Sequence, residues 1–142
     1  MIHVIIVDDD PQYRQDIRAV LEQFDHCIVV GESTNSTEMI EMVQRHPPDI
    51  VLLNGDLIAS DAFEIAGLLR SSVAAIGIII LTQFPDEERL FHYIKVGANA
   101  YITRTISPKL LIETVHRVSS GEFLFSDEKA GSEPYLSLMQ QN

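Results

Sequence analysis

Short runs of apolar residues recur along the chain, separated by polar turns and by segments of helical period. Within each run nearly every residue is apolar, which is typical of strands buried on both faces of a sheet. The pattern therefore predicts five buried strands, at residues 2–7, 27–30, 50–53, 76–81 and 100–102.

Between these runs, apolar residues recur at spacings of three and four, the pattern of one helical face. After Pro11, for example, they fall at Tyr13, Ile17, Val20, Leu21 and Phe24. Helices are expected after Pro11, over residues 36–46, around residues 62–69, from Asp86 to Gly97 and from Ser107 to about Ser119. Their starts carry favourable residues, since acids suit a helix N-terminus and serine followed by proline is a common first turn.

Strict alternation of strands and helices predicts an α/β fold, with a parallel sheet between two layers of helices. For five strands the commonest right-handed arrangement is the flavodoxin-like (βα)5 three-layer sandwich, with strand order 2-1-3-4-5. This order places a crevice at the carboxyl ends of strands 1 and 3. We assign residues 1–120 to this domain and residues 121–142 to a linker or C-terminal tail, because the composition changes at Gly121.

Length and charge narrow the class of protein. A chain of 142 residues suits one domain with a single core. A formal net charge of −11 argues against direct binding to nucleic acid. No apolar run approaches the roughly 20 residues of a membrane span, and the apolar start lacks the basic segment of a secretory signal. The single cysteine, Cys27, fits a reducing compartment, so we expect a cytoplasmic protein.

Polar side chains follow four of the predicted strands at the same edge of the sheet. They are Asp8, Asp9, Asn54, Asp56, Thr82 and Arg104. Clustered carboxylates suit magnesium, and a hydroxyl and a cation nearby suit a phosphoryl group. Taken singly, each has a simpler interpretation, as a helix cap, a loop hydrogen-bonder or a surface cation. Their joint placement favours a functional site.

Beyond this constellation, the chain resembles the receiver domain of bacterial two-component response regulators, over roughly residues 1–120, and within that family the NarL/FixJ type. The segments that carry the resemblance are VDDDP at 7–11, PDIVLL at 48–53, LT at 81–82, GANAYI at 97–102 and SP at 107–108. The resemblance implies that Asp8 and Asp9 are an acidic metal-binding pair and that position 54 accepts phosphate. It also implies that Thr82 and Tyr101 couple the site to the surface of helix 4, strand 5 and helix 5.

Several positions depart from the family pattern. The phosphate-accepting aspartate is replaced by Asn54, the invariant lysine by Arg104, and a usually small residue by Gln83. A neutral amide is no nucleophile, because its nitrogen lone pair is delocalised into the carbonyl. Concurrent departures favour a natural pseudo-receiver that works without phosphorylation. An engineered change of aspartate to asparagine at position 54 in a conventional receiver is the alternative.

The charges that remain predict weak or absent magnesium binding, with no cofactor required. Asp8 and Asp9 face one cation, Arg104, whose planar fork can bind a carboxylate through two hydrogen bonds. We expect Arg104 to bridge to Asp8 or Asp9 and to hold the site in one state. Asp56 would restore a third acid if its side chain turned inward.

The sequence suggests a protein-binding module and not an enzyme. The resemblance implies a protein partner or a homodimer through the face of helix 4, strand 5 and helix 5, and a DNA-binding output domain C-terminal to this chain. The rival is a haloacid-dehalogenase-like phosphohydrolase, because Asp8-Asp9-Asp10 has the Asp-x-Asp spacing after the first strand. Against it, Gln83 and Phe84 stand where a later acidic pair would complete its metal site.

Overall fold

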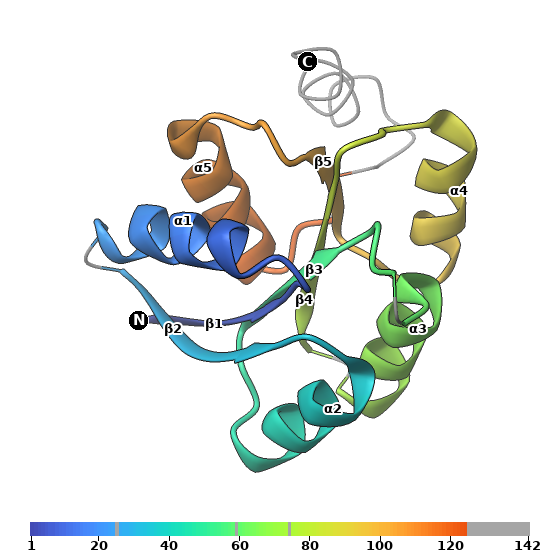
Figure 1. The fold of residues 1–142 in the computed structure, drawn as a ribbon, viewed down its shortest axis with the longest axis horizontal. Helices are drawn as coiled ribbons and strands as arrows, with labels where there is room; N and C mark the ends of the chain where they lie inside the picture. The colour runs from blue at the N-terminus through green and yellow to red at the C-terminus, as the bar shows by residue number, and fades with distance from the viewer. Residues whose placement is uncertain (25, 59, 74, 125–142) are drawn as a thin grey trace.

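The computed structural model describes residues 1–124 except residues 25, 59 and 74. Parallel strands form one sheet in the order β2-β1-β3-β4-β5 (Figure 1). The strands are β1 (Ile2–Val7), β2 (Cys27–Ser33), β3 (Ile50–Asn54), β4 (Gly77–Thr82) and β5 (Ala100–Thr103). The flavodoxin-like strand order predicted from the sequence is therefore confirmed.

Helices alternate with the strands and begin where capping residues predict. They are α1 (Pro11–Glu22), α2 (Ser36–Arg45), α3 (Ala62–Ser72), α4 (Glu87–Lys95) and α5 (Pro108–Ser119). The side chain of Asp10 accepts from the backbone N–H groups of Gln12 and Tyr13 at the start of α1, and that of Ser107 accepts from Leu110 at the start of α5. Each bond satisfies a backbone donor that the first helical turn leaves unpaired.

The sheet lies between two layers of helices, as Figure 1 shows. The core on one face packs α1 and α5 against the sheet, through residues such as Leu21 and Val115. The core on the other face packs α2, α3 and α4, through residues such as Met39, Leu69 and Tyr93. Because helices cover both faces, the central strands carry apolar residues on both sides, which explains their continuous apolar runs.

The strands extend past the predicted ends at the edge that matters for function. β2 runs to Ser33, where pairing with Val7 continues after a register shift. β3, β4 and β5 each end one residue later than predicted, at Asn54, Thr82 and Thr103. Asn54 and Thr82 are thus held by the sheet itself.

The described body continues past α5 to residue 124. Leu124 is buried in the core between α5 and the sheet, and its N–H donates to Asn99 O at 2.9 Å. The side chain of Asn99 also donates to Glu122 O at 3.1 Å. The predicted linker or tail at 121–142 therefore begins with an anchored segment, and its remainder, 125–142, lies outside the described residues. In the part of the chain described, none of the helices has the length and apolar character needed to cross a membrane.

Gly77, at the start of β4, marks a close approach between a strand and a helix. A Cβ there would lie 2.5 Å from Val118 Cγ1 and 2.7 Å from Ile50 Cδ1. Gly77→Ala is therefore expected to lower the free energy of unfolding by about 1–3 kcal/mol, measured by urea denaturation. Gly67→Ala is the matched control, because a Cβ at this position in α3 meets nothing within 4 Å. It should stabilise by roughly 0.5–1 kcal/mol, and equal midpoints for the two variants would contradict the packing described.

Candidate functional site

The predicted polar constellation gathers at the carboxyl edge of the sheet. Asp8 directly follows β1, Asn54 ends β3, Thr82 ends β4 and Arg104 directly follows β5. Asp8, Asn54 and Thr82 are 2%, 5% and 0% exposed. Buried polar groups persist only where their hydrogen bonds are made inside the protein, so the partners of each group define the site.

The amide of Asn54 lies between the two acids. Its nitrogen donates to Asp8 Oδ1 at 3.2 Å and to Asp9 Oδ1 at 3.3 Å, which uses both of its N–H groups. Its oxygen accepts from the backbone N–H of Asp56 at 2.8 Å, which fixes the orientation of the amide. The nitrogen side of the amide therefore faces the carboxylates.

Arg104 makes the predicted bridge, and makes it to Asp8. Arg104 Nη1 donates to Asp8 Oδ2 at 2.8 Å, and the Arg104 side chain is only 8% exposed. Its guanidinium carbon lies 3.7 Å from the centre of the Tyr13 ring, and the Tyr13 hydroxyl donates to Arg104 O at 3.0 Å. Stacking on an aromatic face is a property of the flat guanidinium that a lysine lacks.

Burial dominates the electrostatics of Asp8. Loss of water around the carboxylate raises its pKa above the ordinary value, although the backbone N–H of Asp10 and the charge of Arg104 oppose that rise. The charge and hydrogen bond of Arg104 therefore offset part of the free-energy cost of burying the Asp8 carboxylate.

The carboxylates that could bind a metal ion are engaged by donors of the chain itself. All four carboxylate oxygens of Asp8 and Asp9 already accept hydrogen bonds, from Asp10, Asn54, Arg104 and Ile58. Asn54 presents a donating nitrogen to the acids where magnesium requires an oxygen ligand. Among the described residues, no group of three or more acids, histidines or cysteines is placed to hold a metal ion.

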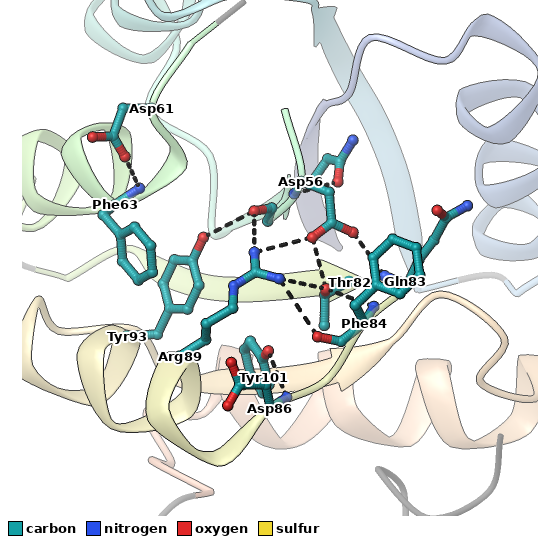
Figure 2. A network of polar contacts seen from close by, with 12 residues as sticks. Asp56, Asp61, Phe63, Thr82, Gln83, Phe84, Asp86, Arg89, Tyr93 and Tyr101 are labelled. Carbon is teal, nitrogen blue, oxygen red and sulfur yellow. Dashed lines mark hydrogen bonds and ion pairs between the residues drawn. The ribbon is translucent and has the colours of Figure 1, made fainter. Parts of the chain in front are cut away.

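Asp56 does not join Asp8 and Asp9 but turns toward β4 and α4. Its Oδ1 accepts from the Thr82 hydroxyl at 2.8 Å, and its Oδ2 from the Gln83 N–H at 2.7 Å (Figure 2). Arg89 of α4 pairs with Asp56 Oδ1 at 3.0 Å. The attraction of this cation and two further donors explains why Asp56 supplies no third acid to the pair at β1.

The aromatic residue expected to couple the site to the surface lies under α4. Tyr101 is fully buried, and its hydroxyl accepts from the N–H of Asp86, the N-cap of α4, at 3.2 Å. Tyr93 lies beside it, with ring centroids 5.6 Å apart. Burial raises the pKa of Tyr93 to about 12, so its hydroxyl stays protonated and donates to Gly55 O at 3.3 Å.

Sequence reasoning missed two residues that shape the site, Arg89 and Tyr13. Arg89 stands four residues before the buried Tyr93 on α4, and a spacing of four places two side chains on the same helix face. This spacing was the sequence signal that Arg89 could reach the site. Tyr13 was read only as part of the apolar face of α1. Its contact with Arg104 joins residues 91 positions apart and leaves no local pattern.

Comparison with known proteins identifies the class to which this fold and site belong. Residues 4–116 match the family model of the response regulator receiver domain. The chain therefore belongs to the response regulator receiver domain family. This membership decides against the haloacid-dehalogenase-like alternative.

The chain is similar to response regulators of the NarL/LuxR type. It is 25% identical over 124 residues to the nitrate/nitrite response regulator protein NarL of Escherichia coli, which covers 87% of this chain and 57% of that protein. It is 29% identical over 124 residues to the uncharacterized transcriptional regulatory protein YxjL of Bacillus subtilis, with the same shares covered. The chain thus spans 57% of the length of either relative. A LuxR-family two-component response regulator from Aurantimonas has a TM-score of 0.81 at 24% identity, over 87% of this chain and 88% of that one.

Proposed function

We propose that this receiver domain is not an enzyme and signals through protein contacts, independently of phosphorylation. The observation that carries the proposal is the Asn54 amide, which donates to Asp8 and Asp9 at the position of the family's phosphate acceptor. Attack on phosphorus needs an oxygen with an available lone pair and negative charge. Asn54 carries no negative charge, its nitrogen is an engaged donor and its amide oxygen is a weak nucleophile that accepts from Asp56.

Magnesium binding to this site is proposed to be weak or absent. The ion would have to displace the Arg104 bridge to Asp8 and the two donor bonds of Asn54. The hydrogen-bonded arginine and amide already satisfy the acids, so little free energy would be gained by the exchange. The domain then needs no cofactor to hold the crevice together.

The output surface is proposed to be the face of α4, β5 and α5, through which the domain binds a protein partner or a second copy. Thr82 and Tyr101 are both buried and both make hydrogen bonds that reach α4 or its N-cap, which supports this choice. Relatives named as transcriptional regulatory proteins are longer than this chain, which supports a DNA-binding output domain C-terminal to it. A cytoplasmic setting fits such a regulator.

Phosphoryl uptake is the test of the proposal. The protein is incubated with acetyl phosphate and magnesium, and its intact mass is measured, in parallel with Asn54→Asp. We expect no mass gain of a phosphoryl group in the parent and slow uptake by the variant, which regains the carboxylate nucleophile. In a second measurement, beryllofluoride should leave the amide spectrum of the parent unchanged. A phosphoryl group mapped to this crevice in the parent would overturn the proposal.

A further inference from the structure

Three donors converge on the carboxylate of Asp56, and they come from three different segments. The Thr82 hydroxyl lies at the end of β4, the Gln83 N–H in the loop after it, and the Arg89 guanidinium on α4. Their distances to the carboxylate oxygens are 2.8, 2.7 and 3.0 Å, all within the range of direct hydrogen bonds. Figure 2 shows Arg89 and Asp56 at the centre of this network.

A hydroxyl, a backbone N–H and a guanidinium form a donor set that suits an oxyanion. In this structure the oxyanion that they bind is the carboxylate of Asp56, which belongs to the same chain. Burial disfavours the charged form of Arg89, but its hydrogen bond and ion pair with Asp56 raise the pKa of the guanidinium. Asp56 and Arg89 side chains are 20% and 27% exposed, so the pair is partly shielded from water.

Arg89 also ties α4 to the end of β3. Its Nη2 donates to Gly55 O at 2.6 Å as well as to Asp56, and Tyr93 on the same helix donates to the same carbonyl. One turn earlier, the N-cap Asp86 donates from its backbone to Tyr101. Two side chains of α4, Arg89 and Tyr93, therefore bond to Gly55 or Asp56 at the end of β3.

We propose that Thr82, Gln83 and Arg89 form an oxyanion site that the chain fills with its own Asp56 carboxylate, and that this internal occupant holds α4 in place. The inference deepens the proposed function, on which it rests, because it names what sets the output surface when no phosphoryl group is attached. Phe84 and Phe91, which are 68% and 53% exposed, lie next to and on α4, so the occupant also fixes where these apolar side chains are presented.

The experiment removes the occupant and then offers a substitute. In Asp56→Ala, amide hydrogen exchange of α4 is expected to be about tenfold faster or more, because a charge-assisted bond and its partners are lost. Inorganic phosphate should then shift the Gln83 amide resonance of the variant and slow the exchange again. The parent should show neither response to phosphate, because the site is filled. Asp16→Ala, which removes an exposed acid of α1, should behave as the parent.

Unchanged exchange of α4 in Asp56→Ala, or a phosphate response equal to that of the parent, would overturn the inference. Asp56→Asn gives a second variant that keeps the shape and an acceptor oxygen but loses the charge. It should speed the exchange of α4 less than alanine does, and exchange equal to the parent would count against the role of the charge. Phosphoryl uptake by the parent would end the proposed function without altering these results, so the two failures are distinguishable.

Discussion

Asn54→Asp is expected to lower the free energy of unfolding by about 2–3 kcal/mol, and the thermal midpoint by roughly 10 °C, in the absence of divalent ions. The change replaces both donor bonds of the Asn54 nitrogen by a third carboxylate beside Asp8 and Asp9. Arg104 is the cation paired with Asp8 among the described residues, and its single charge cannot offset three carboxylates, so like charges repel at close range. Differential scanning calorimetry of parent and variant measures the loss.

The response of the thermal midpoint to magnesium distinguishes two causes of destabilisation in Asn54→Asp, repulsion between carboxylates and the loss of hydrogen bonds. The variant's midpoint should rise with added magnesium, whereas the parent's midpoint should stay constant, because three carboxylates suit the ion and two engaged ones do not. Asn35→Asp is the matched control, since the Asn35 amide also donates to a carboxylate, that of Glu38 at 2.9 Å, but at an exposed site where water screens the added charge. If Asn54→Asp were as stable as the parent and did not respond to magnesium, the Asn54 amide would not be needed to stabilise the carboxylates of Asp8 and Asp9.

Arg104→Met is expected to destabilise the fold by about 3–5 kcal/mol, because it leaves the buried carboxylate of Asp8 without its cation. It also removes the stack on the Tyr13 ring. Urea denaturation gives the difference. Arg18→Met is the control, because Arg18 is 40% exposed in its pairs with Glu22 and Glu32. Exposed pairs contribute about 0.2–1 kcal/mol, so the control should lose far less.

The effect of Arg104→Met should depend on pH. The pKa of Asp8 is already raised in the folded protein, and removal of the opposing cation raises it further. A carboxyl group with a raised pKa destabilises the fold fully above its folded pKa and not at all below its unfolded value, 3.8. The difference between parent and variant should therefore shrink as pH falls toward that value. A difference that stays constant or grows would mean that Asp8 is not the group left unpaired.

Much of the fold could be predicted from local sequence patterns. The strand ends that were predicted wrongly have a common cause. Apolar runs located every strand because both faces of this sheet are buried. β2 was predicted three residues too short, since Gly31, Glu32 and Ser33 carry no apolar signal. Those residues are in the sheet because their backbones pair with β1, and pairing of that kind depends on a neighbour far away in sequence.

Positions in the site were predictable, but directions of side chains were not. Strand ends placed Asp8, Asn54 and Arg104 together, and the bridge between Arg104 and Asp8 followed from their charges. Asp56 was assigned to the same acid cluster because it stands two residues after Asn54. Its orientation is decided by Arg89, which approaches from α4, and no local pattern reports how a helix is rotated against the sheet.

The hydrogen bonds around Asn54 also bear on how the protein ages. Asparagine before glycine is prone to deamidation, in which the next backbone nitrogen attacks the side-chain carbonyl and a cyclic imide opens to aspartate or isoaspartate. Here the Gly55 N–H is held by Leu81 O at 2.8 Å, and the Asn54 carbonyl is held by Asp56 N. Attack by the Gly55 nitrogen would first have to break its hydrogen bond to Leu81 O. The pairing of Gly55 with β4 is therefore expected to slow the spontaneous conversion of Asn54 to aspartate or isoaspartate.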